Sequence, residues 1–206
     1  MDLETSKNLG GVGAILMFIS PLLTYVALYA GLLGLVGFIL VLIALKGLGD
    51  YYNEGGIFNN ALYGFMIGVV GGVVAVGAFV ASVLTILADI GISDWMNASE
   101  WTAAFTAGTA FDTILKLAGA VVIALLILFV VVVITAWFYR KSLDSLSAKS
   151  GVGMFGTAGL ILLIGAFLTV VFIGFLLIWI AILLAAVAFF SIRRKTTESP
   201  SPPQPS

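Results

Sequence analysis

The sequence predicts an all-α protein, a polytopic transmembrane helical bundle of six spans arranged as paired hairpins. Apolar residues make up 62% of the chain and charged residues 9%, and the mean hydropathy is +1.22, outside the range of soluble domains. Four long stretches contain no Asp, Glu or Arg, which is what membrane-spanning helices require. The basic residues also gather on one side of the six-span arrangement.

The four charge-poor stretches are residues 9–45, 57–88, 117–139 and 151–192. A helix rises about 1.5 Å per residue and the hydrocarbon core is about 30 Å thick, so one span takes about 20 residues. The two middle stretches therefore predict one span each. The first and last are long enough for a hairpin each, turning near Gly31 to Gly34 and near Gly174, because glycine permits tight turns. The expected domain covers 1–195, with spans at about 9–29, 33–50, 60–88, 113–139, 153–172 and 174–192, and a disordered Pro/Ser-rich cytoplasmic tail at 196–206.

The distribution of basic residues sets the expected orientation. With six spans and a cytoplasmic N-terminus, eight of the nine basic residues fall on the cytoplasmic side, and both termini share that side. Lys116 alone falls outside, among acidic residues. Treating the long stretches as single spans would move several basic residues outside, so six spans in the cell membrane is the better interpretation. The cytoplasmic set is Lys7, Lys46, Arg140, Lys141, Lys149, Arg193, Arg194 and Lys195.

Composition also limits the chemistry. The chain has no cysteine and no histidine, which removes thiolate sites and the commonest proton shuttle and metal ligand. We find no catalytic constellation and expect no enzyme activity and no cofactor. The net charge of -1 gives no basis for nucleic-acid binding, so the expected partners are the lipid bilayer, a second copy of the chain or other membrane proteins.

The first and last hairpins resemble each other. Residues 11–19 align with 156–164, and Gly37-Phe38 with Gly174-Phe175. Apolar sequences align easily by chance, so the repeat stays an open alternative; if real, it is parallel rather than inverted.

Three segments carry a resemblance to a known family. They are KNLGGVGAIL near the N-terminus, ALKGLGDYYNEGGIFNNALYGF in the middle, and GTAGLILLIGAFL with AFFSI toward the C-terminus. With these, residues 1 to 192 resemble the membrane proteins known as domain of unknown function 996. The resemblance implies an integral membrane protein and carries no catalytic motif, activity or cofactor.

The strongest packing motif lies on the third span. Gly64, Gly68 and Gly72 recur every four residues, so they form a smooth stripe, a glycine zipper, that another helix can approach closely. The stripe can serve as a homo-oligomer face or as an internal contact between spans. We favour the internal contact because one chain supplies six helices.

A cluster of polar and aromatic residues follows the second span. Lys46, Asp50 and Glu54 are four residues apart and share a face if that helix continues, with Gly55 and Gly56 as its stop. The cluster predicts either a cytoplasmic ligand or headgroup site or, as we favour, an aromatic belt with a solvated salt bridge. The full set is Lys46, Asp50, Tyr51, Tyr52 and Glu54.

The external loop, residues 89–112, is the longest polar connection. Ser99, Glu100 and Thr102 predict the start of a short helix lying at the membrane surface. The loop carboxylates match no calcium-loop spacing, and Asn97-Ala98-Ser99 is a glycosylation sequon on the external side.

The spans offer few polar side chains, and no ionisable one lies at mid-membrane depth, which disfavours an ion-driven pump. Ser20, Thr24 and Tyr25 lie along the first span next to Pro21 and can line a narrow pathway. The preferred interpretation is a non-enzymatic structural or interaction protein of the membrane. The alternative is a channel or permease for a small neutral or weakly polar solute.

Overall fold

The computed structural model describes residues 1–24, 31–94, 96–106 and 110–193, and the regular elements in these ranges are all helical. Six of these helices are long and apolar enough, by length and composition, to cross a membrane. The predicted all-α bundle is therefore confirmed. The elements are α1 (Leu3–Thr24), α2 (Gly31–Tyr51), α3 (Gly55–Asp89), α4 (Ala98–Thr106), α5 (Ala110–Ser150), α6 (Met154–Leu168), the 3-10 turn η2 (Thr169–Val171) and α7 (Ile173–Phe190).

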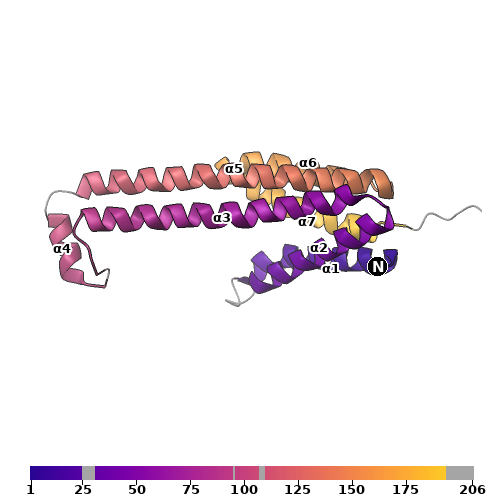
Figure 1. Ribbon diagram of the computed structural model, residues 1–206, viewed down its shortest axis with the longest axis horizontal. Coiled ribbons are helices and arrows are strands. Elements are labelled where there is room, and N and C mark those ends of the chain that lie inside the picture. The colour runs from indigo at the N-terminus through magenta and orange to yellow at the C-terminus, as the bar shows by residue number, and fades with distance from the viewer. Residues whose placement is uncertain (25–30, 95, 107–109, 194–206) are drawn as a thin grey trace, which may run out of the picture.

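The six apolar helices form three hairpins that close into a ring. Helix α1 packs along α2, α3 along α5, and α6 along α7. The ring closes because α2 also contacts α3, α5 contacts α6, and α7 contacts α1. The short α4 lies outside this ring, at the far end of the α3/α5 pair (Figure 1).

The hairpins differ in length. Helices α3 and α5 have 35 and 41 residues, whereas α1, α2, α6 and α7 have 22, 21, 15 and 18. Figure 1 shows the consequence: the two short hairpins lie beside one half of the long pair, and the other half runs on to α4 without them. We call these the bundled half and the bare half of the α3/α5 pair.

Ring contacts give the level at which each short hairpin ends. Phe167, near the end of α6, lies 6.4 Å from Phe129 of α5, measured between ring centroids. Thirteen helical residues separate Phe129 from Lys116, about 20 Å at 1.5 Å per residue. In the other hairpin, Phe38 of α2 packs on Phe65 of α3 at 5.3 Å. Both short hairpins therefore stop well before the end of the long pair.

The closely packed core lies at the end of the ring that holds the N-terminus. Fully buried side chains from α2, α3, α5, α6 and α7 meet there, and the rings of Phe155 and Phe189 pack edge-on with centroids 5.0 Å apart. The buried Ser142 hydroxyl donates to the Ile57 carbonyl oxygen at 2.5 Å, joining α5 to the first turn of α3. This end is thus a fixed base from which all three hairpins extend.

Glycine permits close helix crossing in both short hairpins. A Cβ added at Gly37 would lie 2.5 Å from the Gly13 carbonyl oxygen, and one at Gly165 would lie 3.0 Å from the Gly174 carbonyl oxygen. The backbones thus approach too closely for any side chain. The hairpins are joined to each other by Trp179, whose indole N–H donates to the Phe18 carbonyl oxygen at 2.8 Å while its ring stacks on that of Phe18.

Two turns differ in detail from the sequence expectation. Helix α2 ends at Tyr51, and Asn53 takes a left-handed conformation with a φ of 52°, so the turn precedes Gly55 and Gly56. These two glycines begin α3 rather than stop α2. In the α6/α7 hairpin the left-handed residue is Phe172, with a φ of 63°.

Candidate functional site

A cavity of about 330 Å³ lies inside the ring, in the bundled half. All six apolar helices contribute to its wall. Among the described residues that line it, two carry a polar side-chain group, Thr135 and Tyr139 on α5. The lining residues are Ala14, Met17, Phe38, Val41, Leu45, Gly68, Gly72, Leu128, Val131, Val132, Thr135, Ala136, Tyr139, Leu143, Ala158, Leu162, Ile178, Ala181, Ile182, Ala185 and Phe189.

Glycines on α3 shape the wall opposite α5. A Cβ at Gly64 would lie 3.2 Å from both the Thr135 carbonyl oxygen and Cε2 of Tyr139, so α3 approaches α5 closely there. A Cβ at Gly68 would lie 3.4 Å from the Thr135 hydroxyl oxygen. At Gly72 an added Cβ would meet nothing within 4 Å, because this residue faces the cavity. Two glycines of the stripe therefore lie against α5 and the third leaves space.

The Thr135 and Tyr139 hydroxyl oxygens are buried and have no hydrogen-bond partner in the part of the chain that the structure describes. Other helical hydroxyls in the described ranges behave differently: those of Ser82, Thr85 and Ser191 donate to the carbonyl four residues earlier. Leaving a buried hydroxyl unpaired costs about 1–3 kcal/mol. The two residues are four apart on one face of α5, and both line the cavity.

Ser20, the one residue of the expected polar pathway whose side chain lies in the described part of the chain, is apart from this cavity. Ser20 is buried, and its hydroxyl oxygen lies 2.8 Å from where a Gly34 Cβ would be, so it packs between α1 and α2. Ser20 does not line the cavity. The Thr24 side chain and Tyr25 fall outside the described residues.

The predicted cytoplasmic interface site divides into two parts. The Lys46 ammonium lies 2.7 Å from the Asp50 carboxylate and 5.6 Å from the centre of the Phe58 ring, while the Tyr51 and Tyr52 rings pack edge-on. Glu54 belongs elsewhere, because α2 ends before it: its carboxylate lies 3.1 Å from the Lys149 ammonium at the end of α5. That hydrogen bond and the lysine charge hold the Glu54 pKa below its usual value.

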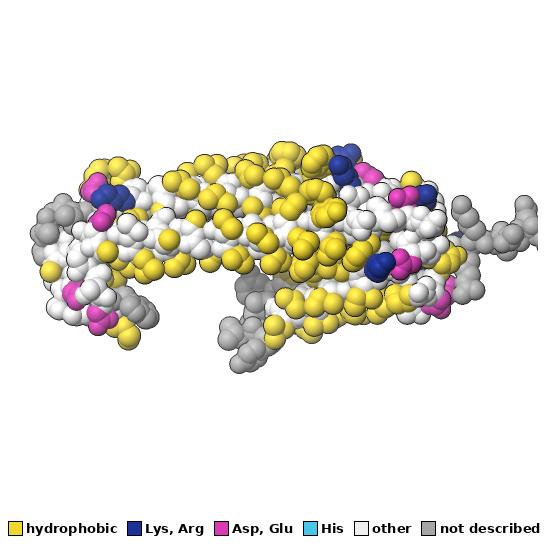
Figure 2. Space-filling model, viewed as in Figure 1, with side chains coloured by type: hydrophobic (Ala, Val, Ile, Leu, Met, Phe, Trp, Pro, Cys, Tyr) yellow, Lys and Arg dark blue, Asp and Glu magenta, His cyan; other side chains and the backbone are white. Residues whose placement is uncertain are grey.

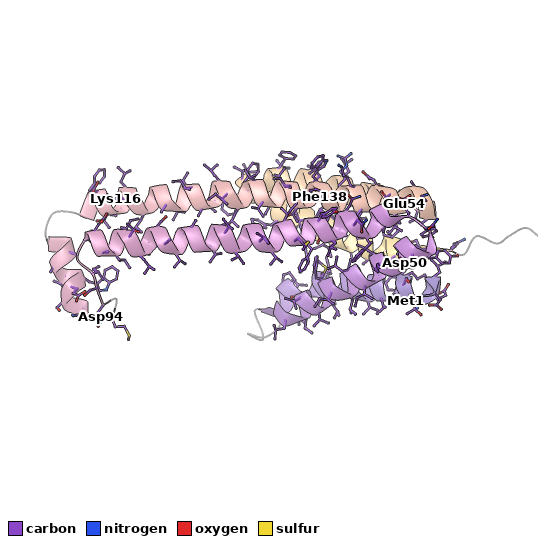
Figure 3. The ribbon with its side chains drawn as sticks, viewed as in Figure 1. Met1, Asp50, Glu54, Asp94, Lys116 and Phe138 are labelled. Atoms are coloured by element: carbon purple, nitrogen blue, oxygen red, sulfur yellow. The ribbon has the colours of Figure 1, made fainter. Side chains whose placement is uncertain are left out.

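Charged groups mark the two ends of the long pair. Figure 3 shows Asp50, Glu54 and Met1 at one end, with Asp94 and Lys116 at the other. At the far end the Lys116 ammonium lies 3.1 Å from Asp112 and 3.9 Å from Asp89, which ties α5 to α3. Among the described residues, no group of three or more acidic side chains could hold a metal ion.

The external loop is organised around Glu100. Its carboxylate accepts from the backbone N–H groups of Ser93 at 2.6 Å and Asp94 at 3.0 Å, which lowers its pKa. The Asn97 side-chain oxygen accepts from the Ser99 N–H at 3.1 Å and so caps α4. The helix that the sequence predicts from Ser99 is present as α4, starting one residue earlier.

The chain belongs to the family described as "Protein of unknown function (DUF996)", which matches residues 33–183. This confirms the resemblance noted in the sequence. The chain is also similar to an uncharacterized protein of Methanocaldococcus jannaschii, with 28% identity over 194 residues that cover 93% of this chain and 94% of the relative. No solved structure matches the chain.

The sequence analysis did not single out Thr135 and Tyr139 as a pair. Each is unremarkable alone, since Thr occurs in several spans and Tyr139 stands at the end of an apolar stretch. The available signal was their four-residue spacing on the helix opposite the glycine stripe.

Proposed function

We propose that this chain is a non-catalytic, multi-pass integral membrane protein with a structural role, and that it occupies the two leaflets unequally. The observation that carries the proposal is the difference in depth between the short hairpins and the long pair. Helices α3 and α5 would cross the whole bilayer, while α1/α2 and α6/α7 would enter from the cytoplasmic face and end inside it.

The surface of the bare half supports placement in lipid. Val73 on α3 is 68% exposed and Leu125 on α5 is 58% exposed, and similar side chains cover this half of the pair (Figure 2). Apolar surface this extensive is unfavourable in water and suited to hydrocarbon. Between Lys116 and Arg140, α5 rises about 36 Å, enough for a bilayer core of about 30 Å with some tilt.

The tip of the α6/α7 hairpin is as apolar as its sides. Val170, Phe172 and Ile173 are 65%, 79% and 59% exposed. The turn keeps much of its backbone paired, because the Phe172 N–H donates to the Thr169 carbonyl and the Thr169 hydroxyl to the Ala166 carbonyl. A largely paired backbone with apolar side chains suits a turn that lies within lipid.

The expected orientation follows the basic residues, as the positive-inside rule prefers. Both termini would be cytoplasmic and α4 external. All six apolar helices would then occupy the cytoplasmic leaflet, while α3 and α5 alone would occupy the outer one. The protein would then be a wedge, wider in the cytoplasmic leaflet than in the outer one. A wedge of this shape favours a membrane that is convex on its cytoplasmic side.

Cysteine labelling tests the arrangement, since the natural chain has no cysteine. A membrane-impermeant maleimide should label Thr5→Cys only from the cytoplasmic side and Ser99→Cys only from outside. Val170→Cys should resist labelling from both sides. External labelling of Val170→Cys at the rate of Ser99→Cys would show that the hairpin crosses completely and would remove the wedge.

A vesicle-sorting assay tests the structural role. The labelled protein, reconstituted with its termini outward, should partition toward small vesicles over large ones of the same lipid. Equal density on both would contradict a role in membrane shape.

The alternative, a channel or permease, predicts flux of a small neutral solute into reconstituted liposomes. The cavity lining gives it little support, because a solute would meet two hydroxyls in an otherwise apolar wall. A second copy of the chain or another membrane protein remains a proposed partner along the bare half.

A further inference from the structure

We propose that the central cavity binds a single-chain lipid, with the chain in the apolar part and an oxygen at its end hydrogen-bonded to the Thr135 or the Tyr139 hydroxyl. The inference rests on the membrane placement proposed above, which gives such a molecule access to the ring.

The shape of the cavity favours one extended chain. Its lining runs along α5 from Leu128 to Leu143, about 22 Å at 1.5 Å per residue. A volume of about 330 Å³ spread along that length is elongated, which suits an extended hydrocarbon chain. Its volume is about twice that of an apolar cavity known to bind benzene.

The polarity of the wall favours a ligand with one oxygen-bearing end. Water gains little in a cavity with so few partners, since a buried water makes about three hydrogen bonds. Thr135 and Tyr139 lie four residues apart on α5, and their hydroxyls have no partner among the described residues. A ligand hydroxyl or carboxyl group that reached either hydroxyl would supply the missing hydrogen bond. A pocket that is mostly apolar with a few convergent polar groups is the usual form of a small-molecule site.

The two ends of the cavity differ in how they are closed. Toward the base, Leu45, Leu143 and Phe189 are buried in the core cluster and seal it. The opposite end lies near Leu128 and Ile178, at the level where the short hairpins end. A chain would therefore enter from the middle of the bilayer with its oxygen-bearing end leading toward Tyr139.

The test uses the full-length chain in nanodiscs and a photoreactive long-chain fatty alcohol that carries a diazirine on its chain. We expect cross-linked peptides from the cavity wall around Leu128 and Ile178. Excess unlabelled fatty alcohol should compete about five- to tenfold more strongly than the matching alkane, the ratio expected for one net hydrogen bond of about 1 kcal/mol. Labelling confined to outward-facing residues would overturn the proposal. Equal competition by the alkane would overturn the role of the hydroxyls.

Two variants sharpen the result. Gly72→Leu places a side chain in the cavity and should abolish the wall cross-links. Gly77→Leu is its matched control, because Gly77 is on the same helix, has nothing within 4 Å of an added Cβ and does not line the cavity. The double variant Thr135→Val with Tyr139→Phe should keep the cross-links but lose the preference for alcohol over alkane. Undiminished wall labelling in Gly72→Leu would contradict a ligand in this cavity.

A failure of the ligand proposal can be told apart from a failure of the membrane placement on which it rests. If Thr5→Cys and Ser99→Cys label from opposite sides while no cross-link forms in the cavity, the placement stands and the ligand proposal fails. If the two cysteines label from the same side, the placement itself fails.

Discussion

The long α3/α5 pair and the two short hairpins differ in which residues face glycine where their helices approach most closely. In the short hairpins glycine meets glycine, at Gly13 with Gly37 and at Gly165 with Gly174. In the long pair glycine on α3 meets larger residues on α5: Gly64 lies against Tyr139. The short hairpins thus pair glycine with glycine where they cross, whereas Gly64 of α3 approaches the α5 backbone at Thr135 beside the large Tyr139 side chain. The ring combines both, and the cavity lies between them.

The two kinds of hairpin also end differently. The α3/α5 pair ends in a polar loop with Asp94 and Glu100, whereas the α6/α7 pair ends in exposed Val170 and Phe172. A polar end fits water and an apolar end fits lipid. Helices of similar hydropathy within one chain therefore end at different levels along the bundle.

The largest expected effect comes from a charge in the bare half. Val73→Asp places a carboxylate on a 68% exposed apolar surface of α3. If lipid surrounds that surface, the change costs about 3 kcal/mol, because an ionisable side chain at the centre of a spanning helix costs about 2.5–3.5 kcal/mol. We expect a lower fraction of membrane-inserted protein by carbonate extraction. Ser99→Asp in the external loop is the control, and equal insertion of the two variants would contradict a lipid-facing bare half.

The next effect concerns the close crossing in a short hairpin. Gly37→Leu forces apart α1 and α2 and should destabilise the protein by about 1–3 kcal/mol, the usual cost of overpacking. Gly119→Leu on the bare half has nothing within 4 Å of its added Cβ and should be neutral or slightly stabilising. Thermal unfolding in detergent measures both. Equal midpoints would mean that the crossing at Gly37 relaxes without cost.

A smaller effect is expected where the long pair meets the base. Ser142→Ala removes the buried hydrogen bond to the Ile57 carbonyl and should cost about 1 kcal/mol. Ser150→Ala is a control, since that hydroxyl makes only local hydrogen bonds at the end of α5, donating to the Leu146 carbonyl and accepting from the Val152 N–H. Chemical denaturation of the two variants compares them directly, and an effect of Ser150→Ala as large as that of Ser142→Ala would argue against a specific α3–α5 link.

The smallest effect concerns the Glu54–Lys149 ion pair at the base. The folded-state pKa of Glu54 is below its usual 4.5, so the pair stabilises the fold above that pH and its contribution is lost as the pH falls through the folded value. Both groups are exposed, so the change is small. Glu54→Gln should flatten this part of the dependence of the thermal midpoint on pH. If the thermal midpoint of Glu54→Gln falls with decreasing pH as steeply as that of the natural chain, other carboxylates cause the loss of stability in acid.

Much of the fold could be predicted because its causes are local. Charge-free runs separated by polar segments give helices, and runs of nearly twice the spanning length give hairpins. Family membership could be predicted too, since it rests on segments that stand in the sequence. The expected zipper residues Gly64 and Gly68 lie against α5, in line with the favoured internal contact.

Other features of the fold depend on contacts between helices that are far apart in the sequence, and no single apolar stretch contains that information. The level at which α6 stops follows from its contact with Phe129, not from its own hydropathy. The separation of Glu54 from Lys46 follows from a left-handed Asn53, which ends α2 early. The cavity needs Gly68 of α3 beside Thr135 of α5 and the open space at Gly72, with two further hairpins to enclose it.

The depth of Val170 in the bilayer tests the central claim most directly. A fluorophore attached to Val170→Cys is reconstituted in bilayers whose lipids carry quenchers at the headgroup, mid-chain or chain end. We expect the strongest quenching by the chain-end label, because Phe167, three residues before Val170, lies at the level of Phe129, about 20 Å short of Lys116 by helical rise. Strongest quenching by the headgroup label would place the tip at the outer surface and contradict the account.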